Sequence, residues 1–179
     1  MLHERLRPLR AHHRLLLMHA AAIGRRFDVD VLAAVVGRTP AQIRTTLRRA
    51  CSLQVLEVVD RKRGTFEFRH ALTRDAIYDE LVAAQLRPLH REIGAALERI
   101  SNARRASLEE LAYHWWAAGD RRRGCRYNEE AGDRASAVHA EADALKHYGR
   151  ALDLLGRRSA ARTRIEGKIG ALRAREDAV

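Results

Sequence analysis

The stretch VLEVVDRKRGTFEFR, residues Val55 to Arg69, decides the fold. VLEVVD is rich in β-branched residues, and TFEFR alternates polar and apolar residues with a period of two; both patterns are typical of strands. RKRG, between them, ends in glycine and predicts a tight turn. We therefore expect a β-hairpin with a short basic tip.

Helical patterns precede the hairpin and predict helices over residues 12–23, 29–36 and 39–52. Thr39, Pro40 and Gln42 have the spacing of a capping box with proline at the first helical position. The helix that they begin should turn one set of side chains inward and another outward. The inward set is Ile43, Leu47 and Ala50, and the outward set is Arg44, Arg48 and Arg49.

The segment FRHALTRDAIYDEL follows the hairpin and predicts a helix from about Ala71 to Ala84. Pro88 indicates a break or a helix start, and a further helix is expected from Leu89 to Ile100. Three helices followed by a hairpin is the layout of a winged helix-turn-helix. We assign residues 1–100 to such a regulatory domain.

The second half, residues 101–179, is helical throughout, after a polar linker candidate at Ser101–Ser107. Helices are expected over residues 108–118, 122–137, 140–155 and 163–175. Two groups of residues have matching spacing: Cys125, Asn128 and Ala131, and then Leu145, Tyr148 and Ala151. This weak repeat favours a short TPR-like array of helical hairpins, and the alternative is a generic alanine-rich bundle. The predicted fold class is thus mainly α with a small β-hairpin.

The composition limits the partners and the compartment. The formal net charge is +11, with 34 Lys and Arg against 23 Asp and Glu. A basic chain indicates nucleic acid or an acidic protein surface as a partner. However, the arginines are spread along the whole chain, as codon bias in a GC-rich genome also produces. The two cysteines suggest no disulfide framework, and no apolar run is long enough to cross a membrane. We expect a cytoplasmic protein.

Together these motifs resemble a known family. LLLMHAAAIGRRFDVDVLAAVVG, the hairpin and FRHALTRDAIYDEL are similar to the winged-helix region of STAND-type signalling ATPases, especially large LuxR-type transcription regulators and ATPase modules linked to adenylate cyclases. LAYHWWAAGD and HAEADALKHYGRALDLL resemble the TPR-like array that follows in that family. The resemblance covers essentially the whole chain.

The resemblance implies a role for His70. In that family the histidine at the strand-to-helix turn contacts the phosphates of ADP across a domain interface and holds the resting state. His70 matches that position, so it is expected to sense the phosphates of ADP or ATP when an ATPase domain is present. The chain has no GxxxxGK[ST] motif and no acidic Walker B strand. We expect a non-catalytic piece of a longer or split protein that relays nucleotide state through protein contacts.

Alternatives remain for each feature. In this chain alone His70 is expected to pack or to cap a helix, and a metal site is disfavoured because the histidines lack ligand spacing. The competing function is a small DNA-binding winged-helix regulator. Its phosphate and base contacts would come from Arg44, Arg48, Arg49, Arg61, Lys62 and Arg63. Trp115 and Trp116 are expected to pack between helices, and not to form a stacking surface.

Overall fold

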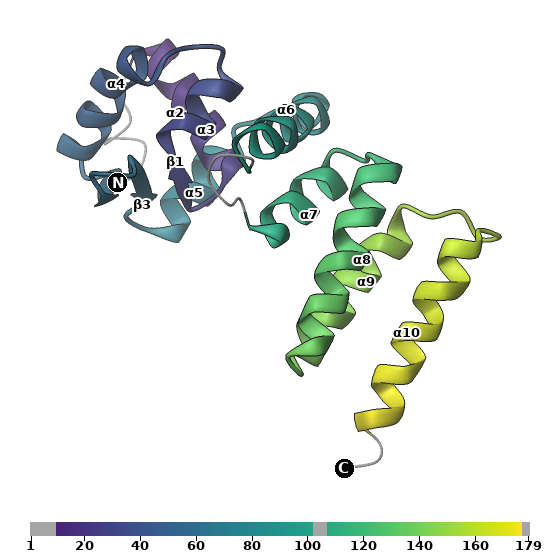
Figure 1. The fold of residues 1–179 in the computed structure, drawn as a ribbon. Coiled ribbons are helices and arrows are strands. Elements are labelled where there is room, and N and C mark those ends of the chain that lie inside the picture. Colours follow the sequence, from purple (N-terminus) through teal and green to yellow (C-terminus); the bar gives the residue numbers. More distant parts are fainter. Residues whose placement is uncertain (1–9, 102–106, 177–179) are drawn as a thin grey trace. The chain divides into compact units, whose positions relative to one another are not determined.

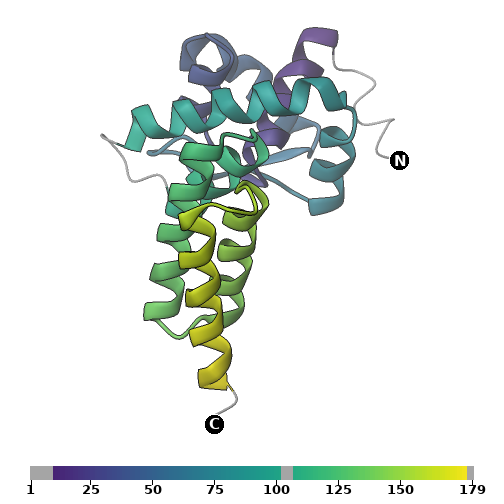
Figure 2. The same ribbon diagram turned by 90° about the vertical axis from the view of Figure 1, so that its right-hand side faces the viewer.

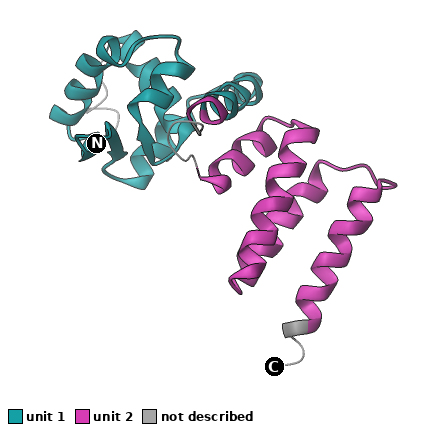
Figure 3. Ribbon diagram, viewed as in Figure 1, with its two compact units in different colours: residues 1–96 teal, residues 97–179 magenta. Residues whose placement is uncertain are grey.

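The computed structural model describes residues 10–101 and 107–176. Backbone packing divides the chain into two compact units, Met1–Ala96 (unit 1) and Leu97–Val179 (unit 2), which Figure 3 colours separately. The predicted linker, Ser101–Ser107, falls mainly on residues 102–106, outside the described residues.

Unit 1 combines helices with one small antiparallel sheet (Figure 1). Its elements are α2 (Ala11–Ile23), β1 (Arg26–Asp28), α3 (Val29–Val35), α4 (Pro40–Ser52), β2 (Leu56–Asp60), β3 (Thr65–Phe68), α5 (Ala71–Tyr78) and most of α6 (Ala83–Ser101). The strand order is β1-β3-β2. This confirms the predicted mainly α class and the hairpin formed by β2 and β3.

Helix α4 has the inward and outward faces that the sequence predicted. Ile43, Leu47 and Ala50 are buried in the core of unit 1. At its start, the Thr39 hydroxyl accepts a hydrogen bond from the backbone N–H of Gln42, and the Gln42 side chain accepts one from the backbone N–H of Thr39. The capping box therefore fixes where α4 begins, and the apolar stripe fixes which face it buries.

Sequence reasoning missed the third strand, β1. Arg26–Asp28 pairs with β3, so that Phe27 lies opposite Phe66. The rings of Phe27 and Phe66 are stacked with centroids 6.0 Å apart. A three-residue strand has too little periodicity to be recognised, because its pairing depends on a partner about forty positions along the chain.

Two helix boundaries near residue 80 were also wrong. The helix expected to reach Ala84 ends at Tyr78, and the next helix begins at Ala83, so Pro88 lies inside α6. Pro88 is in the second turn, where its missing N–H removes one backbone hydrogen bond. The buried stripe of Leu89, Ile93 and Ala96 compensates for that loss.

Unit 2 contains α7 (Leu108–Ala117), α8 (Arg121–Ala137), α9 (Glu141–Asp153) and α10 (Ala160–Glu176). Figures 1 and 2 both show α8, α9 and α10 running side by side. Close packing of α8 on α9 needs a residue without a side chain at Gly132. A Cβ there would lie 2.5 Å from the ring of Tyr148. Within the described residues, no helix is both long and apolar enough to cross a membrane.

Candidate functional site

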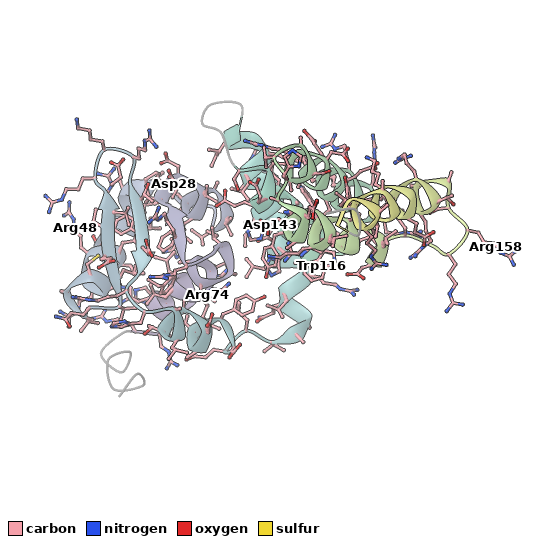
Figure 4. The ribbon with its side chains drawn as sticks, turned by 90° about the horizontal axis from the view of Figure 1, so that it is seen from below. Asp28, Arg48, Arg74, Trp116, Asp143 and Arg158 are labelled. Carbon is pink, nitrogen blue, oxygen red and sulfur yellow. The ribbon has the colours of Figure 1, made fainter. Side chains whose placement is uncertain are left out.

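A cleft of about 400 Å³ separates α4 from the hairpin in unit 1. Arg44, Arg48 and Cys51 line it from α4, at a spacing that places them on one face of the helix. Arg61, from the hairpin tip, lines the opposite side. Figure 4 shows Arg48 at the outer edge of unit 1. We call this feature the arginine cleft. It contains three of the six basic residues proposed for DNA contact.

The floor of the arginine cleft is an uncovered part of the sheet. Leu56 pairs with Phe68 and Val58 pairs with Phe66, so all four side chains lie on the same face. Leu56 and Phe68 are 2% and 0% exposed, whereas Val58 is 43% exposed. The apolar face of the sheet therefore continues toward the hairpin tip past the point where other elements cover it.

The hairpin tip is held by its own hydrogen bonds. The Asp60 carboxylate accepts bonds of 2.8 and 3.0 Å from the backbone N–H groups of Lys62 and Arg63. Both hydrogen bonds lower the pKa of Asp60, and the bond from Arg63 has the larger effect. Gly64 has φ +70°, and a Cβ there would lie 2.5 Å from a methyl group of Val29. The tip is thus fixed against the start of α3, which gives the cleft a defined wall.

The cationic groups of the cleft are not neutralised by neighbours. Among the described residues, Arg44, Arg48 and Arg61 form no ion pair or hydrogen bond through their side chains. The carboxylate in the lining, Asp60, is engaged by the backbone of the tip and by the guanidinium of Arg63 at 3.7 Å. An anion entering the cleft would therefore meet guanidinium groups that need not leave other partners.

The remaining predicted basic residues lie outside the arginine cleft. Arg49 and Lys62 are exposed on α4 and on the tip, and neither lines the cavity. Arg63 is exposed and pairs with Asp60. The structure therefore separates the six residues into three that line the cleft and three that are exposed outside it.

His70 lies elsewhere in unit 1, at the N-cap of α5. It is exposed, and its side chain makes no hydrogen bond to the helix. His70 thus occupies the N-cap position, but its side chain neither packs in the core nor caps the helix, so the role expected for that side chain was wrong. Other groups anchor α5. Ile77 is buried, and the Arg74 side chain donates a 2.7 Å hydrogen bond to the carbonyl of Ala21. Beside His70, Arg69 is exposed and Leu72 is 81% exposed. We call Arg69, His70 and Leu72 the α5 patch.

His90 is a buried histidine with a structural role that the sequence did not reveal. Its ring nitrogen Nε2 lies 3.0 Å from the hydroxyl of Tyr78, joining the end of α5 to α6. Burial, and then the charge of Arg74, lower the pKa of His90 to about 4. His90 is therefore neutral near pH 7 and fills the core as an uncharged hydrogen-bonding group.

Several polar and aromatic groups of unit 2 make contacts within the unit, although the buried indole N–H of Trp115 has no hydrogen-bond partner among the described residues. Trp115 is 1% exposed, which confirms its predicted packing role, and the indole N–H of Trp116 donates to Asp153 at 3.2 Å. Asn128 is fully buried and donates to the carbonyls of Ala112 and Gly124 at 2.7 and 2.9 Å. The importance of Asn128 was missed, because its position in a repeat gave no indication of its hydrogen bonds.

No group of three or more metal-ligating side chains is found in the part of the chain that the structure describes. Comparisons with protein-family models, with curated proteins and with solved structures found no match to this chain. The chemistry of the two surfaces in unit 1, the arginine cleft and the α5 patch, is therefore the basis for a functional proposal.

Proposed function

We propose that this chain is a non-catalytic regulatory module that works through protein–protein contacts, as in STAND-type ATPases. In this proposal unit 1 is a winged-helix domain and unit 2 is a short TPR-like array. The element order of helix, strand, helix, helix and hairpin supports the first assignment. The consecutive helices α7, α8 and α9, closely packed through small residues, support the second.

The α5 patch carries the proposal. The imidazole of His70 lies at the start of a helix and makes no capping hydrogen bond to it, and the helix dipole there also favours negative charge. Leu72, two residues away, exposes 81% of its surface to water. A partner domain that covered Leu72 would bring its bound nucleotide within reach of His70, which would donate a hydrogen bond to a phosphate of ADP. The nucleotide itself would be held by the partner's P-loop.

An affinity-capture experiment with the full chain tests this function. The immobilised chain is incubated with a lysate of the organism that encodes it, in three samples that contain ADP, ATP or no nucleotide. Bound proteins are identified by mass spectrometry. We expect a P-loop ATPase to be retained most strongly with ADP. His70→Ala should remove the ADP dependence, and Leu72→Ser should reduce retention under all conditions. Val82→Ser, at another exposed apolar residue of unit 1, is the matched control and should bind normally.

Two results of the capture experiment would contradict the proposal. One is the absence of any P-loop protein among the retained proteins. The other is a P-loop protein whose retention is the same with His70→Ala, Leu72→Ser and the control. Either result would show that the α5 patch does not recognise a nucleotide-bound partner.

DNA binding is a second candidate, because Arg44, Arg48, Arg49, Arg61 and Lys62 are exposed on α4 and on the hairpin tip without an ion pair among the described residues. A winged helix would place α4 in the major groove and the tip on phosphates. Titration of labelled duplex DNA at low and high salt tests it. Steeply salt-dependent binding that Arg49→Gln and Lys62→Gln both weaken would favour this candidate; no binding at low salt would exclude it.

A further inference from the structure

We infer that the arginine cleft is a binding site for a small organic anion, a carboxylate or phosphate monoester carried by a compact aromatic or branched aliphatic group. The inference goes beyond the proposed function, because the arginine cleft and the α5 patch share no residue. It rests on the juxtaposition of free guanidinium groups with an apolar floor.

The size and lining of the cavity favour a small molecule. Its volume of about 400 Å³ is within the range of ligand sites, which are about 300–1,000 Å³. Val29, Val58 and Phe66 contribute an apolar surface, and Phe66 is itself backed by the stacked ring of Phe27. Such a floor stabilises the body of an organic ligand and offers nothing to an inorganic ion.

The charges of the cleft explain why the ligand should be an anion. Arg44 and Arg48 are one helical turn apart on α4, and Arg61 faces them from the tip. Guanidinium groups bind carboxylate and phosphate oxygens through paired N–H donors, and these bonds are stronger than those between neutral groups. The lining carboxylate, Asp60, already accepts hydrogen bonds from the backbone of the tip. It therefore does not compete with a bound anion for the guanidinium groups of the cleft.

A cavity in unit 2 provides a contrast. It measures about 230 Å³ and is lined by Asp133, Tyr148 and Lys168, among others. There the cationic group is already occupied, because the Lys168 ammonium donates to both oxygens of Asp133 at 2.7 Å and to Glu129 at 2.9 Å. An anion would have to displace two carboxylates, so this cavity is not an equivalent site.

The cleft is better shaped for a small molecule than for a duplex. Phosphates of DNA would contact Arg49 and Lys62, which are exposed outside the cleft, as readily as the cleft arginines, and would leave Val58 and Phe66 untouched. A small organic anion would use the cleft arginines and the floor, and would not reach Arg49 or Lys62. Substitutions at these two groups of residues therefore separate the two ligands.

The test uses 1-naphthoate as a probe, with its neutral analogue 1-naphthamide and with acetate as controls. Binding to the full chain is followed by ¹⁵N NMR of the backbone and of the arginine Nε–H groups. A compact ligand of this size in a suitable site should bind with a Kd of about 1 mM. We expect saturable shifts at Arg44 and Arg48 with 1-naphthoate, and at least tenfold weaker binding of both 1-naphthamide and acetate.

Variants distinguish binding in the cleft from binding to the basic residues around it. Arg44→Gln and Arg48→Gln should each weaken binding of 1-naphthoate about tenfold, which corresponds to the loss of a hydrogen bond to a charged group. Val58→Trp, which fills the cleft without altering charge, should abolish binding. Arg49→Gln and Lys62→Gln keep the cleft intact and should bind as the wild type does.

Cys51 provides a second measurement on the unaltered protein. It lines the cleft and is half-buried, whereas Cys125 is buried in unit 2. Bound 1-naphthoate should slow alkylation of Cys51 by iodoacetamide and leave Cys125 unchanged. The inference is overturned if 1-naphthoate leaves Cys51 unprotected, if 1-naphthamide binds equally well, or if Arg49→Gln weakens binding as much as Arg48→Gln. If the wild type binds no 1-naphthoate, but binds a duplex with an affinity that Arg44→Gln and Arg48→Gln lower and Val58→Trp does not, the cleft arginines serve DNA instead.

Discussion

Helix α4 of unit 1 and helix α8 of unit 2 use their charged side chains in opposite ways. In unit 2, the Glu129 carboxylate on α8 accepts hydrogen bonds of 2.8 and 2.7 Å from Arg164 and of 2.9 Å from Lys168. These bonds connect α10 to α8. In unit 1, Arg44 and Arg48 lie on α4 with no ion pair among the described residues. Charges that bind each other stabilise the fold, and charges left free are available to a ligand or a partner. The charges that join α8 to α10 thus serve the fold of unit 2, whereas those of Arg44 and Arg48 remain available to a ligand or a partner.

The largest expected effect comes from the buried polar centre of unit 2. Asn128 joins α8 to a carbonyl of α7, and its oxygen lies 3.2 Å from the ring of His147 on α9. Asn128→Leu should lower the free energy of unfolding of unit 2 by about 3 kcal/mol, because the partners of Asn128 would remain buried without it. Both tryptophans of the chain lie in unit 2, so their fluorescence during urea unfolding measures this unit. A change below about 0.5 kcal/mol would show that Asn128 is not structural.

Glu129→Gln should have the next largest effect. It keeps the shape of the side chain and removes the carboxylate that holds Arg164 and Lys168. We expect a loss of about 2 kcal/mol, as measured for hydrogen bonds to charged groups. Tryptophan fluorescence in urea is again the measurement. Glu130→Gln, at an exposed neighbour on the same helix, is the matched control and should be neutral. Equal stability of Glu129→Gln and Glu130→Gln would show that the ion pairs of Glu129 do not stabilise unit 2.

The carboxylate of Glu129 should also make the stability of unit 2 depend on pH. Hydrogen bonds from Arg164, followed by those from Lys168, lower the pKa of Glu129 from 4.5 to about 2. The unfolded chain therefore binds a proton before the folded unit does, and protonation favours unfolding. The stability advantage of wild type over Glu129→Gln should be complete above about pH 5 and disappear as the pH falls to about 2. An advantage that is independent of pH would contradict this assignment.

The smallest change in unfolding free energy is expected for a free charge of unit 1. Arg48→Gln removes a charge of unit 1 that holds no carboxylate, so the free energy of unfolding should change by less than about 0.5 kcal/mol. The transition of unit 1 is followed by far-ultraviolet circular dichroism, after the tryptophan signal has identified that of unit 2. A loss as large as that of Glu129→Gln would mean that Arg48 serves the fold.

The sequence predicted the fold best where local signals decide it. The capping box at Thr39, the stripe of Ile43 and Leu47, and the hairpin turn all act within a few residues, and the structure confirms them. The signals failed where tertiary contacts decide. Strand β1 exists because β3 pairs with it, and α5 ends at Tyr78, whose hydroxyl lies beside His90 of the next helix.

The candidate site was predictable in part for the same reason. Helical spacing placed Arg44 and Arg48 on the solvent side of α4, which the structure confirms. No pattern in the sequence indicates that the sheet remains uncovered at Val58, because this depends on how far α4 extends over β2. The exposure of His70 was likewise not predictable, because it depends on how α5 packs through Ile77 and Arg74.

Thermal unfolding of unit 1, measured by circular dichroism with and without 1-naphthoate, tests most directly whether its free charges serve binding and not folding. A ligand at about ten times its Kd stabilises the folded state by about 1.4 kcal/mol, so the midpoint of wild type should rise by several degrees. The double variant Arg44→Gln/Arg48→Gln should have the wild-type midpoint without the ligand and show no rise with it. A lower midpoint without the ligand, or an equal rise with it, would contradict the account.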